Sequence, residues 1–97
     1  MTTLHIENTV TDYDAWKAAF DKFDRARRDR GVRAYRISRD HEDAGKVLVD
    51  LEFDSVSRAE EFREFLHGVF RTPQSQGVSI DHNDPVVLDV VEDVVFA

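Results

Sequence analysis

An alternation of side chains runs through residues 3–10, where every second residue belongs to one face. The mostly apolar face consists of Leu4, Ile6, Asn8 and Val10. This period of two predicts a strand with one buried face. Similar strands are predicted over residues 32–39 and 46–53, the second being the clearest, and a last one over residues 86–94.

Between these strands the period changes twice to that of a helix. The first helix follows the start signal Thr11-Asp12 and ends in a turn that includes Arg27, where cations meet the negative end of the helix dipole. Gly31 then supplies a left-handed cap. The apolar stripe of this helix is aromatic, and it consists of Tyr13, Trp16, Phe20 and Phe23.

The second predicted helix opens within residues 54–57. Ser57 and Glu60 have the spacing of a capping box, and Asp54 or Ser55 is the alternative cap. Thr72-Pro73 ends the helix, because proline cannot continue it. The connection over residues 71–85 is long for a chain of this size, and such segments often form lids or interface arms.

The order strand–helix–strand–strand–helix–strand is that of the ferredoxin-like split unit. It predicts a single α+β domain over residues 1–97, with a four-stranded antiparallel sheet and both helices on one face. The second face of the sheet is mixed in character. It carries His5, Glu7, Arg36, Leu48, Asp50, Glu52, Asp89 and Val91. Either this face is solvated, as is common in antiparallel sheets, or it packs against a second copy with paired charges inside.

Composition narrows the choice of partners. The 97 residues have a formal net charge of −7, a sign that repels the phosphates of nucleic acid. No apolar run approaches the length of a membrane span, and the first residues do not resemble a signal peptide, so we expect a cytoplasmic protein with no membrane partner. Cysteine is absent, which leaves no disulfide or thiol chemistry. The preference for Asp over Glu and Arg over Lys fits either a high-salt cytoplasm or compositional drift.

Candidate chemistry is sparse. Asn8 is a polar residue on an apolar face, so its amide is either bonded to nearby backbone or directed into a cavity. His82 is the one group in the long connection that could titrate near neutral pH, although it also reads as a solvated loop residue. The segments His41-Glu42-Asp43 and Asp81-His82-Asn83-Asp84 lack the spacing of a metal site, and we expect no metal. Phosphate-loop and nucleophile motifs are absent.

The run Val10-Thr11-Asp12-Tyr13-Asp14-Ala15-Trp16-Lys17-Ala18-Ala19-Phe20-Asp21 resembles a signature of small dimeric α+β barrel proteins. These belong to the superfamily of antibiotic-biosynthesis monooxygenases and small polyketide cyclases. Arg27 before Gly31, residues 47–55 and residues 59–62 extend the resemblance, which covers roughly residues 3–70. It implies a homodimer in which two sheets form a barrel, here through the face with His5, Glu7, Arg36, Asp50 and Glu52.

The resemblance also implies a pocket for a small aromatic or polyketide-like ligand between the sheet and its helices, with no bound cofactor. The substrate-binding candidates are Asn8, Tyr13, Trp16, Tyr35, Phe62, Phe65 and His82. Haem-degrading relatives carry their Trp on the second helix, whereas the single Trp lies on the first helix here. Two hypotheses remain, namely an enzyme or binder of the monooxygenase and cyclase type, and a non-catalytic dimeric module that binds a ligand or a protein.

Overall fold

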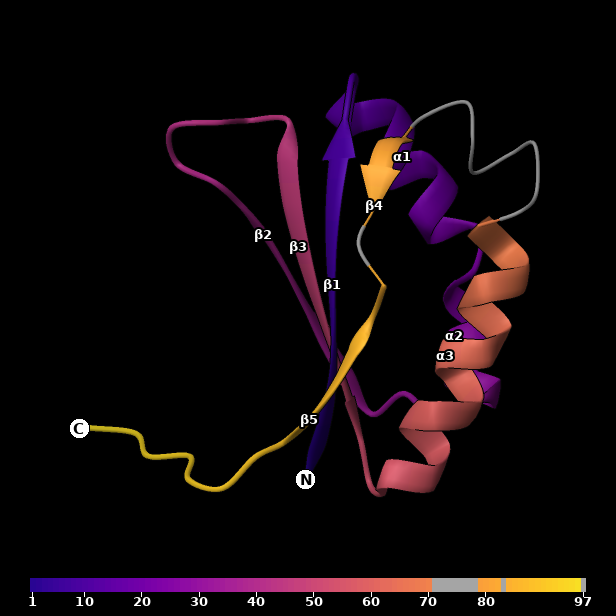
Figure 1. Ribbon diagram of the computed structural model, residues 1–97, viewed down its shortest axis with the longest axis vertical. Coiled ribbons are helices and arrows are strands. Elements are labelled where there is room, and N and C mark those ends of the chain that lie inside the picture. The colour runs from indigo at the N-terminus through magenta and orange to yellow at the C-terminus, as the bar shows by residue number, and fades with distance from the viewer. Residues whose placement is uncertain (71–78, 83, 97) are drawn as a thin grey trace.

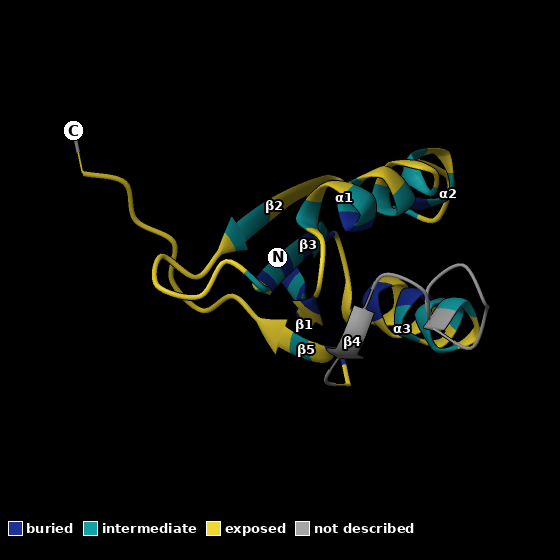
Figure 2. Ribbon diagram, turned by 90° about the horizontal axis from the view of Figure 1, so that it is seen from above, coloured by how far each residue is buried: buried dark blue, intermediate teal, exposed yellow. Residues whose placement is uncertain are grey.

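The computed structural model describes residues 1–70, 79–82 and 84–96, without the side chains of residues 70 and 79–82. The sheet is built from β1 (Thr2–Val10), β2 (Ala34–Arg39), β3 (Lys46–Phe53), β4 (Ser79–His82) and β5 (Val86–Asp89). The helices are α1 (Tyr13–Asp21), α2 (Asp24–Asp29) and α3 (Val56–Phe70). All of these helices lie on one face of the sheet, and the other face is not covered by any helix of the described chain (Figures 1 and 2).

The sheet is antiparallel throughout, in the order β2-β3-β1-β4, with β5 also paired to β1. Two short strands therefore share one edge of β1. β4 pairs with its end from Asn8 to Val10, and β5 pairs with its beginning from Thr2 to His5. This arrangement confirms the predicted ferredoxin-like α+β fold, with the fourth position of the sheet divided between two strands. β4 lies within the segment that the sequence predicted to be a polar connection, and the rest of that segment, residues 71–78 and 83, lies outside the described residues.

Side-chain caps mark where α1 and α3 begin. The Asp12 carboxylate accepts a hydrogen bond from the Ala15 backbone N–H at 3.2 Å, which satisfies one of the free donors at the start of α1. The Ser55 hydroxyl oxygen accepts from the Arg58 N–H at 3.3 Å, so Ser55, and not Ser57, caps α3. Gly31 has φ = 97°, the left-handed conformation expected after the first helical segment.

The first predicted helix is divided in two. Lys22 and Phe23 donate to the carbonyls of Ala19 and Phe20, three residues back in each case, at 3.2 Å. This tighter pattern interrupts the α-helix between α1 and α2. The ring of Phe23, at the break, meets Phe65 of α3 edge-on at 6.5 Å. The prediction of one continuous helix to Arg30 was therefore wrong at residues 22–23.

The last strand is shorter than predicted. β5 ends at Asp89, which lies opposite Thr2, and the Val90 N–H then donates to the Met1 carbonyl at 3.0 Å. Because Asp89 and Val90 already lie beside the first residues of β1, the residues after them extend beyond the end of β1. Residues 91–96 form no strand. They project from the sheet on the side away from the helices (Figures 1 and 2). The same register places Asp89 on the helix-covered face with Thr2 and Leu4. This corrects its predicted position on the second face of the sheet, the helix-free side that is called the outer face below.

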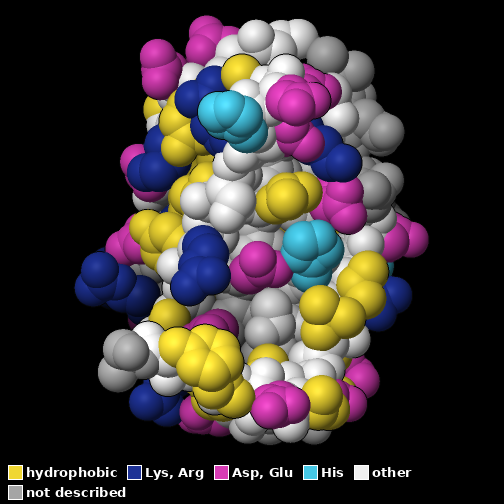
Figure 3. Space-filling model, turned by 90° about the vertical axis from the view of Figure 1, so that its left-hand side faces the viewer, with side chains coloured by type: hydrophobic (Ala, Val, Ile, Leu, Met, Phe, Trp, Pro, Cys, Tyr) yellow, Lys and Arg dark blue, Asp and Glu magenta, His cyan; other side chains and the backbone are white. Residues whose placement is uncertain are grey.

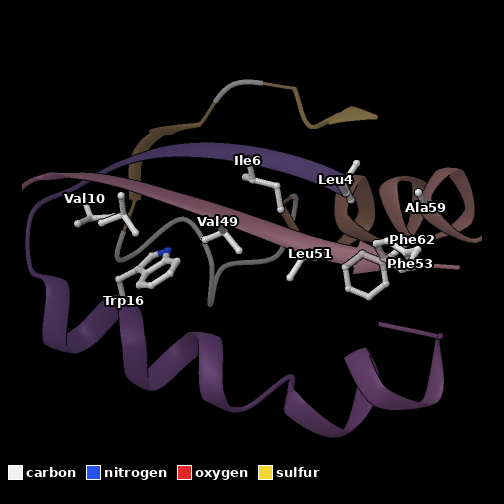
Figure 4. Close-up of a cluster of buried hydrophobic side chains, with 10 residues drawn as sticks. Leu4, Ile6, Val10, Trp16, Val49, Leu51, Phe53, Ala59 and Phe62 are labelled. Carbon is white, nitrogen blue, oxygen red and sulfur yellow. The ribbon is translucent and has the colours of Figure 1, made fainter. Parts of the chain in front are cut away.

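The core lies between the helices and the sheet. Its buried apolar residues are Leu4, Ile6, Val10, Trp16, Val47, Val49, Leu51, Phe53, Ala59 and Phe62. Figure 4 shows Trp16 reaching from α1 toward Val10 and Val49, while Phe53 and Phe62 meet at the opposite end. The residues predicted from the alternation of β1 and β3 are those that the helices cover. Among the described residues, no helix is long and apolar enough to cross a membrane.

Candidate functional site

A cavity of about 270 Å³ lies between the sheet and the helices. Its floor comes from β1 and β3, and its walls come from α1, α2 and α3. The described residues that line it are Ile6, Asn8, Ala15, Trp16, Ala18, Ala19, Phe20, Lys22, Phe23, Arg27, Val49, Leu51, Phe62, Phe65, Leu66 and Val69. Ala18 and Lys22 are exposed, so the cavity reaches the surface at this part of α1. An apolar cavity with few polar groups is the usual form of a small-molecule site.

Aromatic rings make up much of the wall. Trp16 stacks on Phe20 with centroids 5.2 Å apart, and Phe62 lies 5.3 Å from Phe65. The first pair comes from α1 and the second from α3, so flat rings approach the cavity from both helical sides. Such surfaces favour a planar, apolar ligand, because aromatic groups gain from stacked and edge-on contacts beyond simple burial.

Asn8 brings an amide to the floor of this cavity. The residue is buried, and its neighbours on β1, Ile6 and Val10, are apolar core residues. No other described residue forms a hydrogen bond with its side chain. Of the two interpretations that the sequence left open, the cavity-directed one agrees with these contacts, because a structural amide would be bonded to nearby protein groups.

Arg27 is the second polar group, and the sequence analysis did not place it in the site. Its side chain is 5% exposed, and its guanidinium carbon lies 3.6 Å from the centre of the Phe20 ring. Burial lowers the pKa of Arg27 below its usual value, although nearby Asp24 opposes this shift. A signal was present in the sequence, because Arg27 continues the 3–4 spacing of the stripe from Tyr13 to Phe23.

The predicted binding residues divide into two groups. Asn8, Trp16, Phe62 and Phe65 line the cavity. Tyr13 and Tyr35 are not among its lining residues. Tyr13 packs against the outer side of the aromatic row, 5.9 Å from Trp16, and Tyr35 is largely exposed, with its ring edge-on to Phe20. The backbone of His82 lies in β4 opposite Asn8, and its side chain lies outside the described residues.

The outer face of the sheet has a different chemistry (Figure 3). His5 Nδ1 lies 2.6 Å from an Asp50 carboxylate oxygen, and its Nε2 lies 3.4 Å from Glu7. The hydrogen bond with Asp50, supported by Glu7, raises the pKa of His5 above its ordinary value of 6.5. A pocket of about 370 Å³ also lies here, but its lining is polar and charged, including Arg36, Asp50 and Glu52. This lining suits a charged interface better than an apolar ligand.

The predicted turn after β2 is stabilised by hydrogen bonds to its own acidic side chains. One carboxylate oxygen of Asp40 accepts from the backbone N–H groups of Glu42 and Asp43, at 2.8 and 3.1 Å. The acids of this segment therefore shape the turn. Within the described part of the chain, no group of three or more His, Cys, Asp or Glu residues is arranged to hold a metal ion.

The sequence matches no protein-family model and no curated protein. The structure, however, is similar to solved structures over nearly its whole length. A candidate antibiotic biosynthesis monooxygenase from Nitrosomonas europaea has a TM-score of 0.69 at 14% identity, covering 95% of this chain and 100% of that one. A dimeric ferredoxin-like protein from an uncultured marine organism has a TM-score of 0.68 at 17% identity, covering 96% of each chain. The resemblance inferred from the sequence is confirmed at the level of the fold.

Proposed function

We propose that this chain binds a small aromatic or polyketide-like molecule in the cavity between its sheet and helices, and acts on it without a bound cofactor. The observation that carries the proposal is an apolar cavity whose lining includes two buried polar residues, Asn8 and Arg27. A module that binds only another protein would need no such cavity. The likeness in fold to proteins described as antibiotic biosynthesis monooxygenases supports the monooxygenase type of function.

The size of the cavity limits the ligand. Sites for drug-sized molecules occupy roughly 300–1,000 Å³, and the volume here, about 270 Å³, lies just below that range. A ligand of one or two fused rings would fit, and larger polycyclic molecules would need the helices to move apart. The exposed edge at Ala18 and Lys22 offers an entrance.

Trp16 provides the test, because it is the only Trp in the chain and lines the cavity. Phenols and quinones of one or two rings should quench its emission and raise the melting temperature, since a ligand that binds only the folded state stabilises it. Ala19→Leu, which fills the cavity, should weaken this response. Ala26→Leu is the matched control, because Ala26 does not line the cavity. Unchanged emission and melting temperature across the panel would refute the proposal, and oxygen uptake with the ligands that bind would separate turnover from binding.

We further propose that the protein is a homodimer, in which a second copy covers the outer face of the sheet to form a dimeric α+β barrel. Two similar structures are described as dimeric ferredoxin-like proteins. The outer face alternates acids, bases and aliphatic side chains, so a twofold copy can offer opposite charges to it (Figure 3). On this face Asp50 has His5 on one neighbouring strand and Arg36 on the other.

The segment after β5 supports the same partner. Val91, Val95 and Phe96 are 94%, 89% and 93% exposed, an unusual amount of apolar surface for one short segment. This segment projects on the side of the outer face (Figures 1 and 2). A second copy placed there would bury these side chains together with Leu48 and Leu88.

Sedimentation at micromolar concentration should therefore give twice the 11.2 kDa of one chain. The double variant Val91→Lys and Val95→Lys should sediment as a folded monomer, because both positions are exposed within one chain. Val56→Lys, an exposed valine at the start of α3, is the control and should remain dimeric. A monomeric unmodified protein would end the dimer proposal.

A further inference from the structure

Arg27 holds two hydrogen-bond donors that no described residue uses. Among the described residues, neither its Nε nor its Nη2 has a hydrogen-bond partner, and both atoms are buried. A buried donor without a partner is costly, and the cost is greater for a charged group. The fold therefore keeps at this position a group whose hydrogen-bonding capacity the described residues do not satisfy.

The nearest acid compensates Arg27 only weakly. Asp24 lies 3.8 Å from Nη2 of Arg27, which is too far for a hydrogen bond. The other carboxylate oxygen of Asp24 is 3.1 Å from Nε of Arg28, a side chain that is mostly exposed. The guanidinium of Arg27 instead lies over Phe20, with Tyr35 5.5 Å away. These rings hold its plane in place but accept no hydrogen bond through the Nε and Nη2 edge.

The positions of the two free donors define what they can bind. Nε and Nη2 lie on one edge of the planar guanidinium, in the fork that matches the two oxygens of a carboxylate. The ionisable residues that line the cavity are Arg27 and Lys22, both cationic, among the described residues. A negative ligand group is thus favoured inside a chain whose own net charge is −7. A single phenolate oxygen would use only part of this fork.

We propose that the ligand of this cavity is an aromatic carboxylate, whose two oxygens are held by Nε and Nη2 of Arg27 while its rings lie among Trp16, Phe20 and Phe65. This inference rests on the proposed function, because it assigns the polar end of the same ligand. Arg27 then acts as a binding residue that sets both the charge and the orientation of the molecule.

Three matched probes test the assignment on the full-length protein by calorimetry at pH 7, namely 2-naphthoate, 2-naphthamide and 2-naphthol. A bidentate pair with a charged donor predicts roughly tenfold to hundredfold tighter binding of the naphthoate than of the amide. In Arg27→Met this preference should fall to roughly twofold or less, and Arg27→Lys should lose most of it, because an ammonium lacks the fork. Arg25→Met is the control, since Arg25 is exposed and does not line the cavity.

The outcomes separate the two proposals. Equal binding of naphthoate and naphthamide to the unmodified protein, with Trp16 quenched by both, would overturn the carboxylate assignment and leave the proposed function intact. Tighter binding of 2-naphthol than of naphthoate would also overturn it. A loss of stability in Arg27→Met with an unchanged preference would assign Arg27 to packing against Phe20 only. No binding of any probe, and no response of Trp16 to the phenols and quinones, would overturn both proposals.

Discussion

The two faces of the sheet are made from alternate residues of the same strands, yet they differ in almost every property. On β3, the helix-facing residues Val47, Val49 and Leu51 are all buried. The residues between them on the outer face, Leu48 and Asp50, are half-buried in the single chain. The helix face is complete within one chain except for its cavity, whereas the outer face joins apolar and charged groups that remain partly open to water.

Because of this difference in polarity, the two faces suit different kinds of binding. On the helix face, polar groups are few, so Asn8 and Arg27 stand out, and both line one cavity. On the outer face, charged groups are common and satisfy one another, as His5 does with Asp50 at 2.6 Å. An apolar ligand gains most from the first environment, and a second protein surface gains most from the second.

The largest effect should come from truncating the same side chain on each face of β3. Leu51 is 1% exposed, and Leu51→Ala should lower the free energy of unfolding by about 2–5 kcal/mol, as buried leucines do. Leu48→Ala should cost clearly less, and its cost should grow with protein concentration, because the proposed dimer would bury Leu48 further. Urea denaturation at two protein concentrations measures both. Equal losses that do not depend on concentration would remove the distinction between the faces.

A smaller effect is expected for the polar group on the floor of the cavity. Asn8→Ala should change the free energy of unfolding by less than about 1 kcal/mol, because no described residue is left without a partner. Affinity for an aromatic ligand should fall several-fold. Thermal unfolding and calorimetric titration of the same variant give the two values. A loss of about 1–3 kcal/mol with unchanged ligand binding would make Asn8 a structural residue.

The smallest effect concerns pH and belongs to the outer face. Because Asp50 raises the pKa of His5 above 6.5, protonated His5 stabilises the folded state. This contribution is complete below the unfolded pKa of about 6.5 and is lost as the pH rises through the higher folded pKa. The melting temperature should therefore decline modestly as the pH rises from below the unfolded pKa of His5 to above its folded pKa. His5→Gln should make this decline smaller. His41→Gln, in an exposed turn, is the control, and an equal change in both variants would contradict the assignment.

The sequence predicted the helix-facing side of the sheet better than any other part of the molecule. The alternation over β1 and β3 is strict. A one-residue shift in the pairing of these strands would expose a whole apolar face to water, so only one register buries the apolar residues. Trp16 and Phe62 followed from helical spacing for the same reason. The break at Lys22 and Phe23, where Phe23 contacts Phe65 of α3, was missed, because local spacing does not contain contacts with distant parts of the chain.

The candidate site was predicted only where residue type and position agreed. Asn8 was identified because an amide on an apolar face is conspicuous. Arg27 was missed because a cation in the last turn of a helix has an ordinary explanation in the helix dipole. Tyr35 was included as an aromatic wall, although its position on β2, at the edge of the sheet, leaves it largely exposed. Distinguishing these cases required the positions of these side chains in the folded chain.

The most direct test of ligand binding on the helix face is a nuclear magnetic resonance titration with 2-naphthoate. The single Trp gives one indole N–H signal, which reports on the wall of the cavity. We predict that this signal and the side-chain amide signals of Asn8 shift together and saturate with one dissociation constant. Shifts confined to outer-face residues such as His5 and Leu48, or no shift at Trp16 at saturating ligand, would contradict the account.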